Sequence, residues 1–197
     1  MAAPPPPPAA PATALVRQAR EQLAQALTQA LPDLAARMEA FLEHLADQVG
    51  TQREMQAHRA ALERYRAHQA AWVEACRNAL QAALAATGLP AVARSNAALP
   101  GTFELLSDET IENQIQAARL ALATDELAGS SFEALRLRSQ WLQQHELAPD
   151  DLLRPETFCE LLVNQWRAAG LPRADLQGLT APLQTALGEL LQGAAEA

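Results

Sequence analysis

The residues of this chain best suited to metal binding or to acid–base catalysis near neutral pH are its histidines, His44, His58, His68 and His145. Glu54 and His58 stand four residues apart, so on a helix they share one face and offer two ligands to a metal ion. The chain has no His-Glu-x-x-His and no Glu-x-x-His pair, and His58 and His68 are too far apart along a helix to chelate one ion. We therefore interpret the histidines as surface residues and expect no metal site.

Carboxylates and serines offer further chemistry, but none stands in a catalytic pattern. Adjacent acids such as Asp108 and Glu109 diverge by about 100° on a helix, which fits helix-start charges better than a general acid–base pair. Gly129-Ser130-Ser131 lacks the Gly-x-Ser-x-Gly pattern of a nucleophile elbow, and no phosphate-binding glycine loop occurs. We expect no catalytic residue and no cofactor, so the sequence predicts that the protein is not an enzyme.

Composition and charge exclude further classes of function. All 15 basic residues are arginine, which excludes chemistry that needs a lysine. The net charge of −8 argues against nucleic acid and anionic membranes as partners. Residues 1–99 have nine arginines against eight acids, whereas residues 100–197 have six against fifteen. We interpret the acidic half as a solvated surface or, alternatively, as an interaction face for an arginine-rich partner.

We expect neither a secretory signal nor a membrane-spanning segment in this sequence. Residues 1–13 are an alanine–proline run without the positive start and leucine-rich core of a secretory signal, and we expect a disordered leader there. No apolar run approaches the roughly 18 residues of a membrane helix. Cys76 and Cys159 lie in helical patterns beside apolar residues, which favours buried thiols in a cytoplasmic protein.

Two amphipathic helices are expected first, over residues 12–31 and 32–49. Apolar residues recur at three-to-four spacing in both ranges. Because the residue before a proline avoids the α region, we expect the chain to break at Leu31 and Pro32.

A capping box predicts the start of the next helix. Thr51 and Glu54 directly follow Gly50, and their side chains are spaced to bond each other's amides. The helix then continues over residues 51–86, on the order of 50 Å. On this long arm we expect a protein interface at the apolar residues Met55, Leu62, Tyr65 and Trp72.

The second half of the chain predicts shorter helices. One runs from Ser107 to about His145, with Gly129 either breaking or weakening it, and others follow from Pro155 and over residues 173–193. The apolar face of the first is Ile111, Ile115, Ala118, Leu122 and Leu127. The core is expected to hold Trp72, Trp141 and Trp166, with the alternative that one of them anchors an interface.

No run with the period of a strand occurs, so we predict an all-α protein: an N-terminal helical hairpin with a long arm and a C-terminal helical bundle. The expected organisation is a leader (1–13), a hairpin (14–88), a linker (89–102) and an acidic bundle (103–197).

Three landmarks are similar to those of one protein family. The first landmark is residues 105–112 (LLSDETIE), where an apolar pair is followed by an acidic cluster and an Ile-Glu helix start. The second is the long Gln/Arg-rich arm of residues 41–84. The third is residues 154–159 (RPETFC), a segment that begins with Arg-Pro and contains a cysteine. Together they resemble a large bacterial helical family of unknown function, often labelled thymidine phosphorylase. The resemblance implies the N-terminal part of longer relatives and no reaction. A phosphorylase site needs lysine, which this chain lacks.

The function predicted from these observations is a non-enzymatic helical interaction or scaffold protein that binds another protein or itself, with a regulatory role as one interpretation. Two alternatives remain open. An exposed apolar groove would favour a secretion-type chaperone, and a convergent polar cluster inside the bundle would favour a ligand-binding protein.

Overall fold

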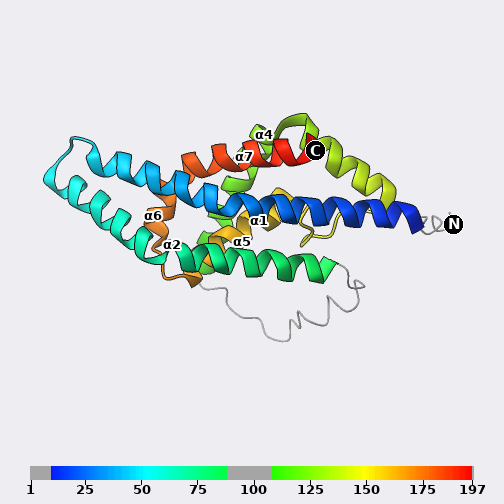
Figure 1. Ribbon diagram of the computed structural model, residues 1–197, viewed down its shortest axis with the longest axis horizontal. Coiled ribbons are helices and arrows are strands. Elements are labelled where there is room, and N and C mark those ends of the chain that lie inside the picture. Colours follow the sequence, from blue (N-terminus) through cyan, green and yellow to red (C-terminus); the bar gives the residue numbers. More distant parts are fainter. Residues whose placement is uncertain (1–9, 88–107, 197) are drawn as a thin grey trace.

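The computed structural model describes residues 10–87 and 108–196, and it folds them into helices with no strand among them (Figure 1). The all-α prediction is therefore confirmed. The helices are α1 (Ala10–Asp47), α2 (Gln52–Thr87), α4 (Asp108–Gln143), α5 (Pro155–Ala168), α6 (Arg173–Gly178) and α7 (Thr180–Glu196). The expected linker and most of the expected leader lie outside the described residues. The last residues assigned to the leader begin α1, where Pro11 is tolerated because first-turn N–H groups lack helical partners.

Helix α1 corrects the predicted break at Pro32, because it is a single helix of 38 residues with this proline inside it. An internal proline costs a helix about 3 kcal/mol. Here Pro32 lies on the exposed side, while Leu31 and Leu34 are 1% and 3% exposed against the rest of the protein. Burial on both sides of the proline offsets the lost hydrogen bond and keeps the helix continuous.

The turn between α1 and α2 confirms the predicted capping box. The Thr51 amide donates to Glu54 Oε2 at 2.9 Å, and the Glu54 amide donates to Thr51 Oγ1 at 3.3 Å. Helices α1 and α2 then run antiparallel as a hairpin (Figure 1). The predicted hairpin is present, although both of its arms are long.

Helix α4 consists of two helical segments that meet at Gly129. This residue has φ 68° and ψ −163°, a conformation in the half of φ space that favours glycine. Beyond Gly129 the chain turns, and the second segment leaves the line of the first (Figure 1). Of the two expectations for this glycine, a break or a weakening, the structure has the break.

One continuous core joins the hairpin to the helices that follow it. Helix α1 packs on α2 and α7, α2 packs on α5, and α4 packs on α5 and α7. The buried cluster includes residues from every helix of the described chain. The two expected modules therefore share their core rather than packing separately.

A buried ion pair fixes α1 to the chain between α4 and α5. The Arg20 guanidinium donates to Asp151, with Nε to Oδ1 at 3.0 Å, and the Asp151 side chain is only 2% exposed. With its side-chain amide turned so that the oxygen faces Arg20, Gln143 accepts a hydrogen bond from the Arg20 guanidinium at 2.7 Å. The Leu153 backbone amide donates to the Asp151 carboxylate at 3.1 Å. Because these groups satisfy one another, the cluster has a structural role.

Candidate functional site: an exposed apolar row on helix α4

Helix α4 carries apolar residues on two opposite faces of its first segment. The face toward the core holds Ala117, Leu120, Ala121, Thr124 and Ala128, all nearly fully buried. On the opposite face Ile111, Ile115 and Leu122 are 42%, 46% and 66% exposed, and Ala118 between them is exposed as well. We call this second set the α4 row: Ile111, Ile115, Ala118 and Leu122.

The α4 row corrects the predicted orientation of this helix. Its residues follow one another at intervals of four, three and four, which places them within about 60° of each other around the helix axis. The sequence favoured this row as the packed apolar face, yet it points away from the core. Leu127, expected on the same face, instead contacts α7: a Cβ built on Gly188 would lie 2.4 Å from the Leu127 Cβ.

Charged side chains and a groove border one flank of the α4 row. Glu112 forms an ion pair with Arg173 at the start of α6. Arg119 lies two helical turns after Glu112 and forms no ion pair with any described residue. A groove of about 510 Å³ follows this flank toward α6 and α7, lined by Ile115, Gln116 and Arg119 among others. The row therefore lies beside a hollow and not on an isolated ridge.

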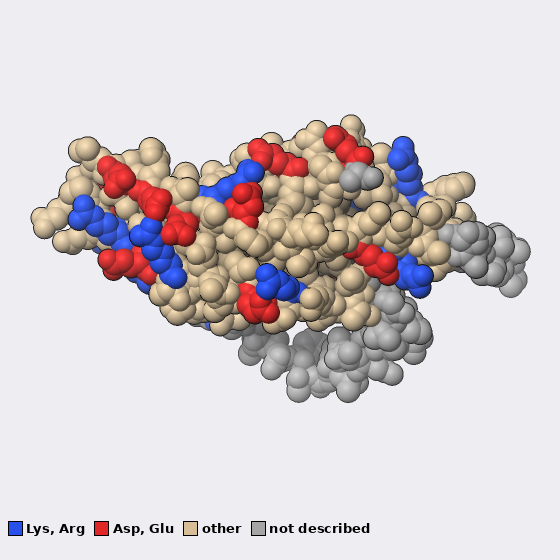
Figure 2. Space-filling model, viewed as in Figure 1, with Lys and Arg blue, Asp and Glu red and all other residues tan. Residues whose placement is uncertain are grey.

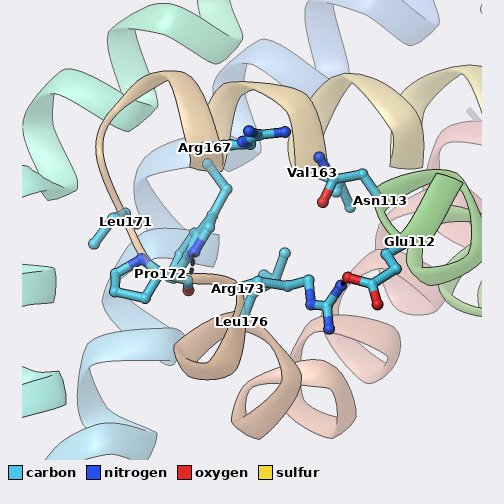
Figure 3. A pocket seen from close by; sticks show the side chains of 9 residues that line it. Glu112, Asn113, Val163, Arg167, Leu171, Pro172, Arg173 and Leu176 are labelled. Atoms are coloured by element: carbon cyan, nitrogen blue, oxygen red, sulfur yellow. Dashed lines mark hydrogen bonds and ion pairs between the residues drawn. The ribbon is translucent and has the colours of Figure 1, made fainter. Parts of the chain in front are cut away.

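A smaller pocket of about 260 Å³ adjoins this groove where α4 meets α5 and α6 (Figure 3). Its lining is mixed, with Trp166 and Leu171 beside the polar Asn113 and Arg167. Arg173 and Glu112 point toward each other across one side (Figure 3). The lining includes two arginines, which suit an anionic group; Arg173 is paired with Glu112, and Arg167 also has a partner within the chain.

The four residues predicted as an interface have different environments within the chain. Tyr65 and Trp72 are 1% and 0% exposed, Leu62 packs against the core as a partly buried residue, and Met55 is half-buried. The two aromatic side chains thus already have partners inside this chain. A protein interface at these residues stays a prediction, for which Met55 and Leu62 retain some exposed surface.

Tyr65, Trp72 and Trp166 form an aromatic cluster at the centre of the core. Trp166 stacks on Tyr65 at 5.6 Å between ring centroids and meets Trp72 edge-on at 5.5 Å. The Tyr65 hydroxyl donates to the Ala35 carbonyl at 3.1 Å, and burial raises the pKa of this phenol. Each polar atom of the cluster has a backbone partner, as buried Tyr and Trp require, so we assign the cluster to stability.

The third tryptophan contradicts its predicted place in the core. Trp141, in the second segment of α4, is 72% exposed, and Leu137 one turn before it is 53% exposed. This position fits the alternative that one tryptophan anchors an interface. Sequence spacing could not separate the three tryptophans, because each lies on a helix among leucines.

The other candidate residues lie apart or have structural partners. Within the described residues no three His, Cys, Asp or Glu side chains gather as a metal site. Glu54 belongs to the capping box, and His58 Nδ1 lies 3.0 Å from the Leu45 carbonyl oxygen. Cys76 and Cys159 are buried as predicted, and burial raises the pKa of each thiol to about 12.

Charges on the surface are paired across helices. Arg66 of α2 bonds Glu39 and Glu43 of α1, Arg64 bonds Asp175 of α6 at 2.9 Å, and on the face drawn in Figure 2 acidic and basic side chains alternate. This face resembles a solvated, ion-paired surface more than a patch of one sign. None of the described helices has the length and apolar character needed to span a membrane.

The chain is similar to the model of a known protein family. No curated protein and no solved structure matches the chain. The family is described as "Protein of unknown function (DUF1631) N-terminal domain", and its model covers residues 11–197. This agrees with the expectation of an N-terminal part of a family without known function. The chain, from the start of α1 to its last residue, belongs to the DUF1631 N-terminal domain family.

Proposed function

We propose that this protein is a non-enzymatic helical interaction module, and that the α4 row binds an amphipathic helix of a protein partner. The observation that carries the proposal is the exposure of Ile111, Ile115 and Leu122 at helix-packing spacing. Single exposed apolar residues are ordinary, but a row at this spacing is the pattern by which one helix packs on another. The adjoining groove offers space for the flank of a bound helix.

The interior of the bundle supports an interaction module over a ligand-binding protein. The buried side chains are mostly leucine, alanine and aromatic residues. The main buried polar cluster, built on Arg20 and Asp151, is satisfied within the chain. The pocket beside Trp166 favours ligand binding as a second candidate function. Isothermal titration with inorganic phosphate, repeated on Arg167→Gln, tests it, and absence of phosphate binding counts against an anionic ligand.

The α4 row would also serve a chaperone, the other alternative, because such a protein exposes an apolar surface to its client. The two functions differ in what they bind. An interaction module captures one folded or helical partner in one register, whereas a chaperone captures many unfolded segments. A cross-linking experiment on the row separates them by the number of products.

The test places a photo-cross-linking amino acid at Leu122 in the producing cell. We expect one discrete conjugate, and we expect Ile115→Asp in the same chain to abolish it. The matched control carries the cross-linker at Ala67, which is exposed on α2. Equal conjugation at both sites, or none at Leu122, would contradict an interaction through the row, and a ladder of many products would favour the chaperone.

A further inference from the structure

We propose that the partner of the α4 row is the same row of a second copy of this protein, with the two α4 helices antiparallel about a two-fold axis. This inference rests on the proposed function and names its occupant. It follows from the order of side chains along the row, the charges on its flank and an unpaired group in the groove.

The spacing of the row is the same in both directions. Ile111, Ile115, Ala118 and Leu122 follow at intervals of four, three and four, so reversing the helix reproduces the pattern. About a two-fold axis midway along the row, Ile111 lies opposite Leu122 of the second copy, and Ile115 opposite Ala118. A large side chain thus meets a small one near the axis, where two helices approach most closely.

The charges on the flank complement each other in the same arrangement. In the antiparallel register the Glu112 of each copy comes within about two residues, or about 3 Å along the axis, of Arg119 of the other copy. Two equivalent ion pairs result. In a parallel two-fold pairing the flank with Glu112 and Arg119 would lie on opposite sides of the contact in the two copies, so these charges would not meet. Among the described residues Arg119 has no acidic partner, so the second copy supplies one.

The groove on this flank holds an unpaired polar atom. Gln116 Oε1 is buried and accepts no hydrogen bond within the described part of the chain, although Gln116 lines the groove beside Ile115 and Arg119. A buried acceptor without a donor is unfavourable. A side-chain donor of the second copy that entered the groove would satisfy this acceptor.

The experiment measures the mass of the complete chain by sedimentation velocity from low micromolar to millimolar concentration. We expect a reversible dimer. Glu112→Arg alone and Arg119→Glu alone each place like charges at both contacts and should raise the dissociation constant by about tenfold or more. An equimolar mixture of the two variants should dimerise again, because every contact between unlike chains then joins opposite charges.

Matched controls separate this contact from a general effect of charge. Arg59 and Glu63 are exposed on α2, and mixing Arg59→Glu with Glu63→Arg should leave the dimer unchanged. Leu122→Asp should also dissociate the dimer, because the introduced carboxylate has no charge partner in the row. Circular dichroism must show wild-type helicity for each variant, and this matters most for Glu112→Arg, which also loses its pair with Arg173.

Each alternative outcome overturns the inference in a recognisable way. A wild-type monomer at millimolar concentration overturns the second copy as partner, and so does a dimer that ignores the α4 substitutions or is not restored by mixing. The proposed function fails separately, when Leu122 forms no conjugate with any protein. A conjugate to a different protein, with a monomeric wild type, would keep the interaction module and reject self-association.

Discussion

Helices α2 and α4 each carry an apolar row, and the structure uses the two rows in opposite ways. On α2 the aromatic residues Tyr65 and Trp72, expected at an interface, lie in the centre of the core. On α4 the residues expected to pack inward, from Ile111 to Leu122, face outward. The aromatic row of α2 thus contributes to stability, and the α4 row is left for a partner.

The contrast shows that large apolar side chains do not by themselves mark the buried face of a helix. The core side of α4 is built mainly from alanines, among them Ala117, Ala121 and Ala128, each 1–2% exposed. Small residues let two backbones approach closely, and Gly188 of α7 continues this contact. Large residues therefore lie on both sides of α4: Leu120 is 2% exposed and Leu127 packs over Gly188, whereas the α4 row faces outward.

The sharpest test of the contrast compares two tryptophans. Trp72→Ala removes a fully buried ring and should lower the free energy of unfolding by about 3–5 kcal/mol. Trp141→Ala, at a 72% exposed site, should change it by less than about 0.5 kcal/mol. Urea unfolding followed by circular dichroism measures both. Similar losses would mean that Trp141 is buried in solution, by this chain or by another copy.

The close contact between α4 and α7 is tested at two glycines of α7. Gly188→Ala should lower the free energy of unfolding by about 1 kcal/mol, because the added Cβ would lie 2.4 Å from the Leu127 Cβ. At Gly193 an added Cβ meets nothing within 4 Å. Gly193→Ala should therefore raise the free energy of unfolding by up to about 1 kcal/mol, because alanine has the higher helix propensity. Thermal denaturation compares the two, and equal stabilisation would contradict the close packing.

The start of α2 depends on a local cap, so its contribution should be smaller and pH-dependent. Thr51→Ala should lower the free energy of unfolding by about 1 kcal/mol at pH 7. Hydrogen bonds from the Thr51 hydroxyl and amide lower the pKa of Glu54, so the cap is complete above the ordinary carboxyl pKa and is lost as pH falls through the folded pKa. The difference between wild type and variant, measured by urea unfolding, should therefore narrow toward pH 3. A difference constant with pH would exclude Glu54 from the cap.

The smallest effect on folding is expected at the α4 row itself. Leu122→Ser should change the free energy of unfolding of the monomer by less than about 0.5 kcal/mol, because Leu122 is 66% exposed. Leu120→Ser, two residues earlier and 2% exposed, is the matched control and should cost several-fold more. Chemical denaturation at low protein concentration measures both. A large loss for Leu122→Ser would place the row in the core of a single chain.

Features governed by neighbouring residues were predictable from the sequence. The helical period, the capping box at Thr51 and Glu54 and the burial of both cysteines were all expected and are present. The candidate site was present in the sequence as the row from Ile111 to Leu122, but it was assigned to the core. The ion pair between Arg20 and Asp151, 131 residues apart, left no local pattern from which to predict it.

The sequence alone determined that this chain forms helices, because apolar spacing and caps act within a few residues. Tertiary structure decided which face of α4 is buried and whether Pro32 breaks α1. Both outcomes depend on contacts between helices distant in sequence. Helix α4 buries its alanine-rich face where it packs on α5 and α7, and α1 stays continuous because Leu31 and Leu34 are buried on either side of the proline. Local propensities amount to about 1–3 kcal/mol, and burial of several large side chains exceeds them.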